Sequence, residues 1–297
     1  MLAVVQFYWS AVVLLLPLLA CAGIGAYWAK RDYPFGGTFI TMLVTTVTTP
    51  ALVFHTFVTT QLDDRALLAI AGASLLALLA CALACAGLLR LFGLPVRTLL
   101  PTAFVPNAGN LGLPVSQLAF GDAGLSAAVA FFVVNSFVTH TIAVRMLPGA
   151  NTPGSWKSPV LLASVAAVTL RALDIPVPDW LVATSRMLGA VTVPLMLLSL
   201  GHALALIPAN GMRAGAVVAA LRLAVGLAAG YAVVWLLGLP DLLAGALALQ
   251  MAMPCAVVSY MYARRYTDVG DIAAGAVLVS TVVFLLLAPA LLWFTRQ

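Results

Sequence analysis

The sequence predicts an all-α polytopic membrane protein with ten transmembrane helices, and three observations lead to this fold class. Of the 297 residues, 64% are hydrophobic and only 8% are charged, which is far from the balance of a soluble domain. The apolar residues form continuous runs of about 20 residues or more, the length that crosses a bilayer as a helix. These runs do not alternate in polarity, as the strands of a membrane barrel would.

Ten such runs can be placed along the chain, and the gaps between them leave no room for a soluble domain. We expect a first unit of five helices over residues 1–147, a short cytoplasmic linker over 148–158, and a second unit of five helices over 159–297. The ten expected helices cover residues 2–28, 38–60, 66–91, 98–121, 124–147, 159–175, 181–206, 211–237, 241–263 and 271–294.

The two halves of the chain repeat short motifs at nearly equal spacing. Gly-Leu-Pro occurs at residues 93–95 and again at 238–240, an offset of 145 residues. Asp-x-Gly followed by two alanines begins at 122 and at 268, an offset of 146, and Pro50 matches Pro194 at an offset of 144. Because each repeat holds an odd number of helices, the second enters the membrane from the opposite side. Inverted repeats are typical of secondary transporters, whose substrate site lies where interrupted helices of the two halves meet.

The fourth expected helix contains the stretch PNAGNLGLP, residues 106–114, in otherwise apolar surroundings. Proline removes a backbone donor and glycine tolerates unusual conformations, so we expect this helix to unwind here. Its counterpart, helix nine, is expected to break at QMAMPCAVVSY, where Pro254 takes the place of Pro114. The free N–H groups at the start of each second half-helix favour an anion. The side-chain amides of Asn107 and Asn110 can donate to a carboxylate.

Four stretches of the sequence form a recognisable set: PNAGNLGLPVSQLAFGDAG, TTPALVFHTF, MAMPCAVVSYMYARRYTD and LVSTVVFLLLAPALLW. Together they resemble the auxin efflux carrier family, whose bacterial members include organic-acid carriers of the malonate type. The resemblance implies two inverted five-helix repeats, a crossover of the broken helices four and nine, and elevator-type alternating access. The residues that match the family's motifs are Pro106, Asn107, Gly112 and Pro114 on helix four, and Met253 and Pro254 on helix nine.

Polar side chains inside the apolar segments add further candidates. Histidine is the side chain that ordinarily titrates near neutral pH, so His55 could handle substrate or protons, while Asn135 and Gln250 place amides inside the membrane. Hydrogen bonding between helices explains these side chains equally well. Arg222 is expected to extend from helix eight toward the cytoplasmic surface. The candidate substrate-binding residues are Pro50, His55, Pro106, Asn107, Gly109, Asn110, Gly112, Pro114, Asn135, Gln250, Met253 and Pro254.

The sequence argues against an enzyme. It contains no H-E-x-x-H or G-x-S-x-G motif, and its nine acidic residues are all aspartates at or near expected loops. Cys81 and Cys85 lie one helical turn apart without histidine or carboxylate neighbours, so packing explains them better than metal binding. No cofactor, metal or nucleic-acid partner is expected, because the net charge of +5 reflects basic residues in short loops.

These features predict a secondary transporter of small organic anions, in contact with lipid and able to form a homodimer, in the inner membrane of a bacterium. A sodium-coupled carrier of the bile-acid symporter type would share the inverted repeats, and backbone carbonyls could bind its sodium. A membrane receptor or assembly factor would not need two interrupted helices at matching positions.

The basic residues predict the orientation of the chain. Most of them lie in loops after odd-numbered helices, which should be cytoplasmic, so both termini should be periplasmic. Single cysteines placed beside Lys30, Arg90 and Arg264 should resist a membrane-impermeant thiol reagent in intact cells, whereas a cysteine beside Asp174 should react. A cytoplasmic C-terminus would contradict the even number of helices.

Overall fold

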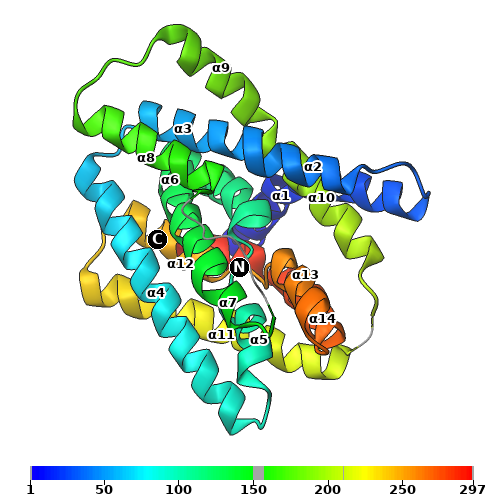
Figure 1. Ribbon diagram of the computed structural model, residues 1–297. Helices are drawn as coiled ribbons and strands as arrows, with labels where there is room; N and C mark the ends of the chain where they lie inside the picture. The colour runs from blue at the N-terminus through cyan, green and yellow to red at the C-terminus, as the bar shows by residue number, and fades with distance from the viewer. Residues whose placement is uncertain (1, 150–156, 210, 296–297) are drawn as a thin grey trace.

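The computed structural model describes residues 2–149, 157–209 and 211–295, and all of its regular elements there are helices (Figure 1). Most of the expected linker over 148–158 lies outside the described residues, as do the side chains of 2–11, 293 and 294. The helices are α1 (Leu2–Lys30), α2 (Gly37–Leu43), α3 (Thr49–Thr59), α4 (Asp64–Leu91), α5 (Val96–Phe104), α6 (Leu113–Val138), α7 (Val144–Met146), α8 (Pro159–Ala172), α9 (Asp179–Ala190), α10 (Thr192–Leu206), α11 (Met212–Leu237), α12 (Asp241–Met251), α13 (Val257–Tyr266) and α14 (Gly270–Thr295). Three π-helical turns join them: η1 (Val44–Thr48), η2 (Ala108–Gly112) and η3 (Thr139–Ala143).

Seven helical segments of the described chain are long and apolar enough to cross a membrane. Two further apolar helices, α8 and α12, are shorter. Large apolar side chains such as Leu83 and Trp235 are mostly exposed on the outer surface, where lipid would surround them. The chain is therefore an all-α, multi-pass membrane protein. The seven segments are Val12–Lys30, Gly37–Thr59, Asp64–Leu91, Ala108–Met146, Asp179–Leu206, Met212–Leu237 and Gly270–Leu292.

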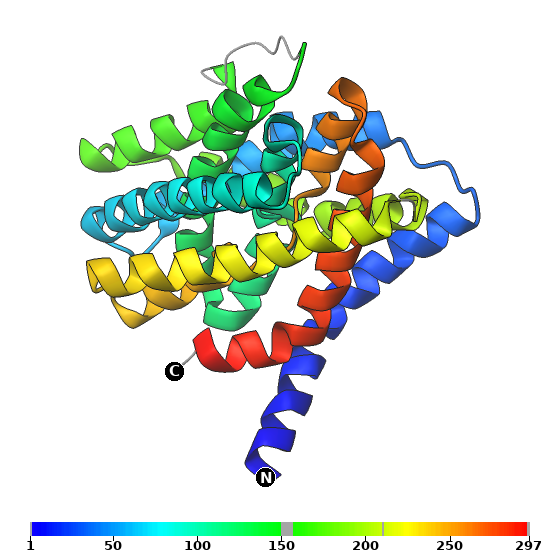
Figure 2. The same cartoon turned by 90° about the horizontal axis from the view of Figure 1, so that it is seen from below.

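The helices pack in two groups. In the α3 group, α1 runs along α10, α3 and η1 pack on α8 and α9, and α2 contacts η1 and α10. In the α11 group, α11 packs on α14, α4, α12 and α5, while α6 packs on α12 and α4 and α13 packs on α14. Figure 1 shows α2, α3, α8 and α9 along one side of the molecule and α4 and α11 along the other. The groups meet where α1 lies beside α14 (Figure 2) and where η2 contacts α10.

Corresponding helices of the two halves end in the same backbone conformation. After α1 and α8, Asp32 and Asp174 adopt left-handed φ values of 51° and 50°. In each case the next residue donates to the carbonyl five positions back, Tyr33 to Trp28 at 3.1 Å and Ile175 to Leu170 at 2.9 Å. This is the hydrogen bond that closes a Schellman motif at a helix C-terminus. The glycines of the two Gly-Leu-Pro motifs end α4 and α11 in the same way, with φ values of 65° and 58°.

The closest helix contact in the α3 group joins α1 and α10 through two glycines. A Cβ atom on Gly25 would overlap the carbonyl oxygen of Leu198, and one on Gly201 would overlap that of Ala22. The backbones therefore approach each other where no side chain intervenes, as small residues allow in membrane helices.

Gly201→Ala should destabilise the fold, because its methyl group meets backbone and not a movable side chain. We expect a loss of about 1–3 kcal/mol, as for other overpacked contacts. Gly72→Ala in α4 is the matched control, since a Cβ there has no atom within 4 Å. Thermal unfolding in detergent should show a lower melting temperature for the first variant only. Equal melting temperatures would contradict the close contact.

Candidate functional site

Two helices of the α11 group are interrupted, and their interruptions lie side by side. α5 ends at Phe104 and the chain resumes as helix at Ala108, while α12 ends at Met251 and α13 begins at Val257. The extended segments between them form an isolated antiparallel bridge. Asn107 donates its backbone N–H to the carbonyl of Pro254 at 2.8 Å, and Ala256 donates to that of Val105 at 3.2 Å. Residues 105–107 and 252–256, the break segments below, are buried.

Two prolines within the break segments and a serine from α14 explain how these segments avoid unpaired N–H groups in an apolar interior. Pro106 and Pro254 have no backbone N–H group, so neither needs a hydrogen-bond acceptor for it. The buried N–H of Cys255 donates to Oγ of Ser280 in α14 at 3.0 Å. Backbone groups at this depth are tolerated only when protein or a water-filled cavity satisfies them. The bridge and Ser280 meet that requirement.

The break in the fourth expected helix lies earlier than Pro114. Pro114 is in the first turn of α6, directly after the π-helical turn η2, in which Gly112 donates to the carbonyl of Asn107 at 3.0 Å. Proline is tolerated in a first turn, so it does not interrupt the chain there. The prediction that Pro254 takes the place of Pro114 is therefore wrong, because Pro254 lies in the break between α12 and α13 whereas Pro114 lies within α6.

Asn107 is the polar side chain at the centre of the break segments. It is only 4% exposed, and its Nδ2 group has no hydrogen-bond partner. The chain continues from it into η2, where Gly109 and Asn110 are half-buried. A Cβ on Gly109 would lie 3.1 Å from the ring of Phe132 in α6 and 3.7 Å from Met196 in α10. The break segments thus adjoin the boundary between the two helix groups.

Gln250 supplies a second buried amide next to the break. It is fully buried in the last turn of α12, and its Nε2 donates to Oγ of Ser116 at 3.3 Å. Its Oε1 has no partner and lies where a Cβ of Gly112 would be. Only glycine at this position leaves room for the amide. Asn107 therefore offers an unpaired donor and Gln250 an unpaired acceptor, which suit a polar ligand.

The remaining candidate residues lie in the break, in α6 and in α3. Met253 is fully buried in the break itself. Asn135 is buried with an unpaired Oδ1, one turn beyond Phe132 on the same face of α6. Pro50 and His55 lie in α3, in the other helix group, where the charged neighbours of His55 are Arg186 and Asp122.

Arg222 reaches the break from α11, which the sequence analysis missed. It does not extend to the surface as predicted, because it is fully buried. Its guanidinium donates to the carbonyls of Phe104 and Met251, the last residues of α5 and α12. It also lies 3.4 Å from Sγ of Cys81. The sequence did contain a signal for this buried role, which is a single arginine in the middle of a long apolar segment.

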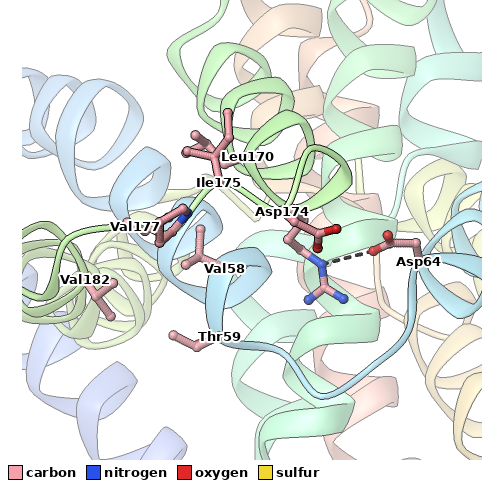
Figure 3. A pocket seen from close by; sticks show the side chains of 10 residues that line it. Val58, Thr59, Asp64, Leu170, Asp174, Ile175, Val177 and Val182 are labelled. Carbon is pink, nitrogen blue, oxygen red and sulfur yellow. Dashed lines mark hydrogen bonds and ion pairs between the residues drawn. The ribbon is translucent and has the colours of Figure 1, made fainter.

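Two cavities lie away from the break segments. One of about 530 Å³ opens between α3, α8 and α9 and includes Asp64, Asp174 and Val182 in its lining (Figure 3). Arg171 crosses it, pairing with Asp64 at 3.0 Å and donating to the carbonyls of residues 57, 60 and 62. These bonds fasten the loop between α3 and α4. Within the described residues no group of three His, Cys, Asp or Glu side chains could hold a metal ion.

Comparison with known proteins gives one result for the chain as a whole. A family model described as membrane transport protein matches residues 10–156 and, a second time, residues 152–292. A comparison with curated proteins finds no match.

Ser280→Ala should destabilise the break, because the buried N–H of Cys255 loses its acceptor. An unsatisfied buried donor costs about 1–3 kcal/mol. Ser74→Ala in α4 is the matched control, since that buried hydroxyl bonds only the carbonyl of Ile70 in its own helix, so its loss leaves no N–H group without an acceptor and should cost less than Ser280→Ala. Thermal unfolding in detergent compares the two. Similar melting temperatures would show that Ser280 does not support the break.

Proposed function

Because the chain belongs to the membrane transport protein family, that of the auxin efflux carriers, we propose that it is a secondary transporter of small organic anions. The family is one of transporters and not of enzymes. The observation that carries the substrate class is the buried, unpaired amide donor of Asn107, which stands where two interrupted helices cross.

The proposed architecture has ten spans in two inverted repeats. The segment Ala108–Met146 has 39 residues, so as one straight helix it would be about 58 Å long, about twice the hydrocarbon thickness. Gly121 inside it has φ 66° and ψ −154°, which divides it into two spans. This division raises the seven membrane-spanning segments to eight, and α5 joins the first part of α6 as one interrupted span. The shorter helix α8 and the interrupted pair α12–α13 add one span each, so the total is ten. The double family match and the shared Asp32 and Asp174 helix ends support a repeat.

The proposed substrate site is the crossing of the break segments. The second half-helices begin there, at Ala108 and at Val257, with N–H groups that no preceding turn can satisfy. Each helix N-terminus carries about half a positive charge, so two of them attract a carboxylate. Asn107 would donate to the carboxylate directly, and Gln250 would accept from a hydroxyl or protonated group beside it.

Alternating access is proposed to follow from the two helix groups. The α11 group carries the complete crossing, and η2 faces α10 of the α3 group through Gly109 and Met196. An elevator movement of the α11 group along the α3 group would carry the bound anion across. We place the protein in the bacterial inner membrane with both termini periplasmic.

A sodium-coupled symporter of the bile-acid type remains the second candidate, since it would have the same interrupted helices. It requires free carbonyl oxygens for the metal ion. The carbonyls of Phe104 and Met251, at the ends of the first half-helices, already accept from Arg222, which favours the anion carrier without sodium.

Asn107→Ala should weaken carboxylate binding and leave folding intact, because backbone donors remain. A hydrogen bond to a charged group is worth about 1.5–3 kcal/mol, so affinity should fall by roughly ten- to a hundredfold. Asn107→Asp keeps the size of the side chain but adds a negative charge, and should bind still less.

The measurement is the melting temperature of the purified protein with a panel of carboxylates and the primary amide of each. Wild type should be stabilised by an acid and not by its amide. Equal stabilisation by both would show that negative charge is not what the site recognises, and the proposal of an anion carrier would be abandoned.

A further inference from the structure

We propose that Arg222 is a built-in cation of the transporter, which occupies the carbonyl ends of both interrupted helices in place of a coupling metal ion. The proposal rests on the proposed transport of organic anions and specifies its ion coupling and substrate charge. It makes transport independent of sodium, and it leaves the crossing with charge for one carboxylate group.

The contacts of Arg222 join three separate helices. From α11, its guanidinium donates to the last carbonyl of α5, that of Phe104, and to the last carbonyl of α12, that of Met251. These residues are 118 and 29 positions away in sequence. Gly226, one turn farther along α11, makes room for the group, since a Cβ there would overlap both Nη2 of Arg222 and the Met251 oxygen. The site is thus formed around the guanidinium.

The charge of Arg222 is compensated by helix ends and not by a carboxylate. Arg222 is fully buried. Among the described residues the one ion pair joins Arg171 and Asp64, at the loop between α3 and α4, so Arg222 has no carboxylate partner among them. A helix C-terminus is equivalent to about half a negative charge, so the two carbonyl ends together balance about one guanidinium. Without the cation, two C-terminal ends would face each other in a dry interior, where unpaired polar groups are costly.

Two consequences follow for transport. Carbonyl ends of interrupted helices are the places where carriers of this architecture bind coupling cations, and Arg222 already fills them. The N-terminal ends that begin at Ala108 and Val257 are then unopposed, with about half a positive charge each. Their sum matches a single carboxylate. The structure therefore favours a monoanion, or one carboxylate of a larger acid with its other charge outside the crossing.

The test removes the fixed cation and supplies a free one. Arg222→Ala should lower the melting temperature in detergent, and guanidinium chloride at low millimolar concentration should restore at least half of the loss, with saturation. Arg213→Ala is the matched control, because Arg213 lies on the same helix but is exposed. It should change neither the melting temperature nor its response to guanidinium. Wild type should melt at the same temperature in sodium chloride and in choline chloride at equal ionic strength.

Specific stabilisation of wild type by sodium over choline would overturn the proposal, as would an Arg222→Ala protein that melts like wild type or ignores guanidinium. If Arg222→Ala does not fold, Arg222→Lys replaces it. The lysine variant keeps one charge but can bond only in part, so it should melt below wild type and remain indifferent to sodium. A higher melting temperature of wild type in sodium chloride than in choline chloride would overturn the proposal in this case as well.

These measurements need no carboxylate, so they separate the two proposals. Rescue by guanidinium together with equal binding of acid and amide would retain the role of Arg222 and reject the anion carrier. Preference for the acid without rescue would do the reverse.

Discussion

Backbone groups that leave a helix inside the hydrocarbon layer must find partners within the protein, and the α11 group is arranged around that requirement. Between Phe104 and Ala108, and between Met251 and Val257, the helical hydrogen bonds stop. The two break segments pair with each other through one bridge, α14 contributes the hydroxyl of Ser280, and α11 contributes Arg222. Removing any one of these partners would leave a polar group without a bond in an apolar interior.

The same requirement explains why polar side chains gather in so apolar a chain. Gln250 bonds Ser116 across α12 and α6, and Arg222 holds the ends of α5 and α12 at a fixed separation. With those groups in place, the amide of Asn107, the oxygen of Gln250 and Nε of Arg222 are left unpaired. Rigid supporting bonds around a small unpaired remainder are what a preorganised binding site requires.

Contacts within a helix group differ from those that link the two groups. Within the α3 group, small residues allow backbones to approach, as Gly201 does between α1 and α10. At the edge, Arg171 ties the loop that leads from α3 into α4, and therefore from one group to the other. The crossing lies wholly in the α11 group, so a movement between groups would not have to disturb its hydrogen bonds.

The sequence by itself determined the helices and the weak points within them. Apolar runs gave boundaries within a few residues of α1, α4, α11 and α14, because length and hydrophobicity are local properties. Prolines and glycines identified both interrupted helices, since they act on their own backbone. The family resemblance, carried by the motif around Asn107, was confirmed by the family match.

Only the tertiary structure decided which side chains and backbone groups contact each other. It confined the break to residues 105–107, at the start of the expected stretch 106–114, and placed Pro114 in the first turn of α6 after a π-helical turn. It placed His55 in the α3 group, away from the break segments of the α11 group, and turned Arg222 inward to carbonyls of two other helices. The sequence pattern carries no such information, because the partners of a buried polar group lie far along the chain and depend on how helices pack. Local preference sets where a helix can break, and packing sets what completes the break.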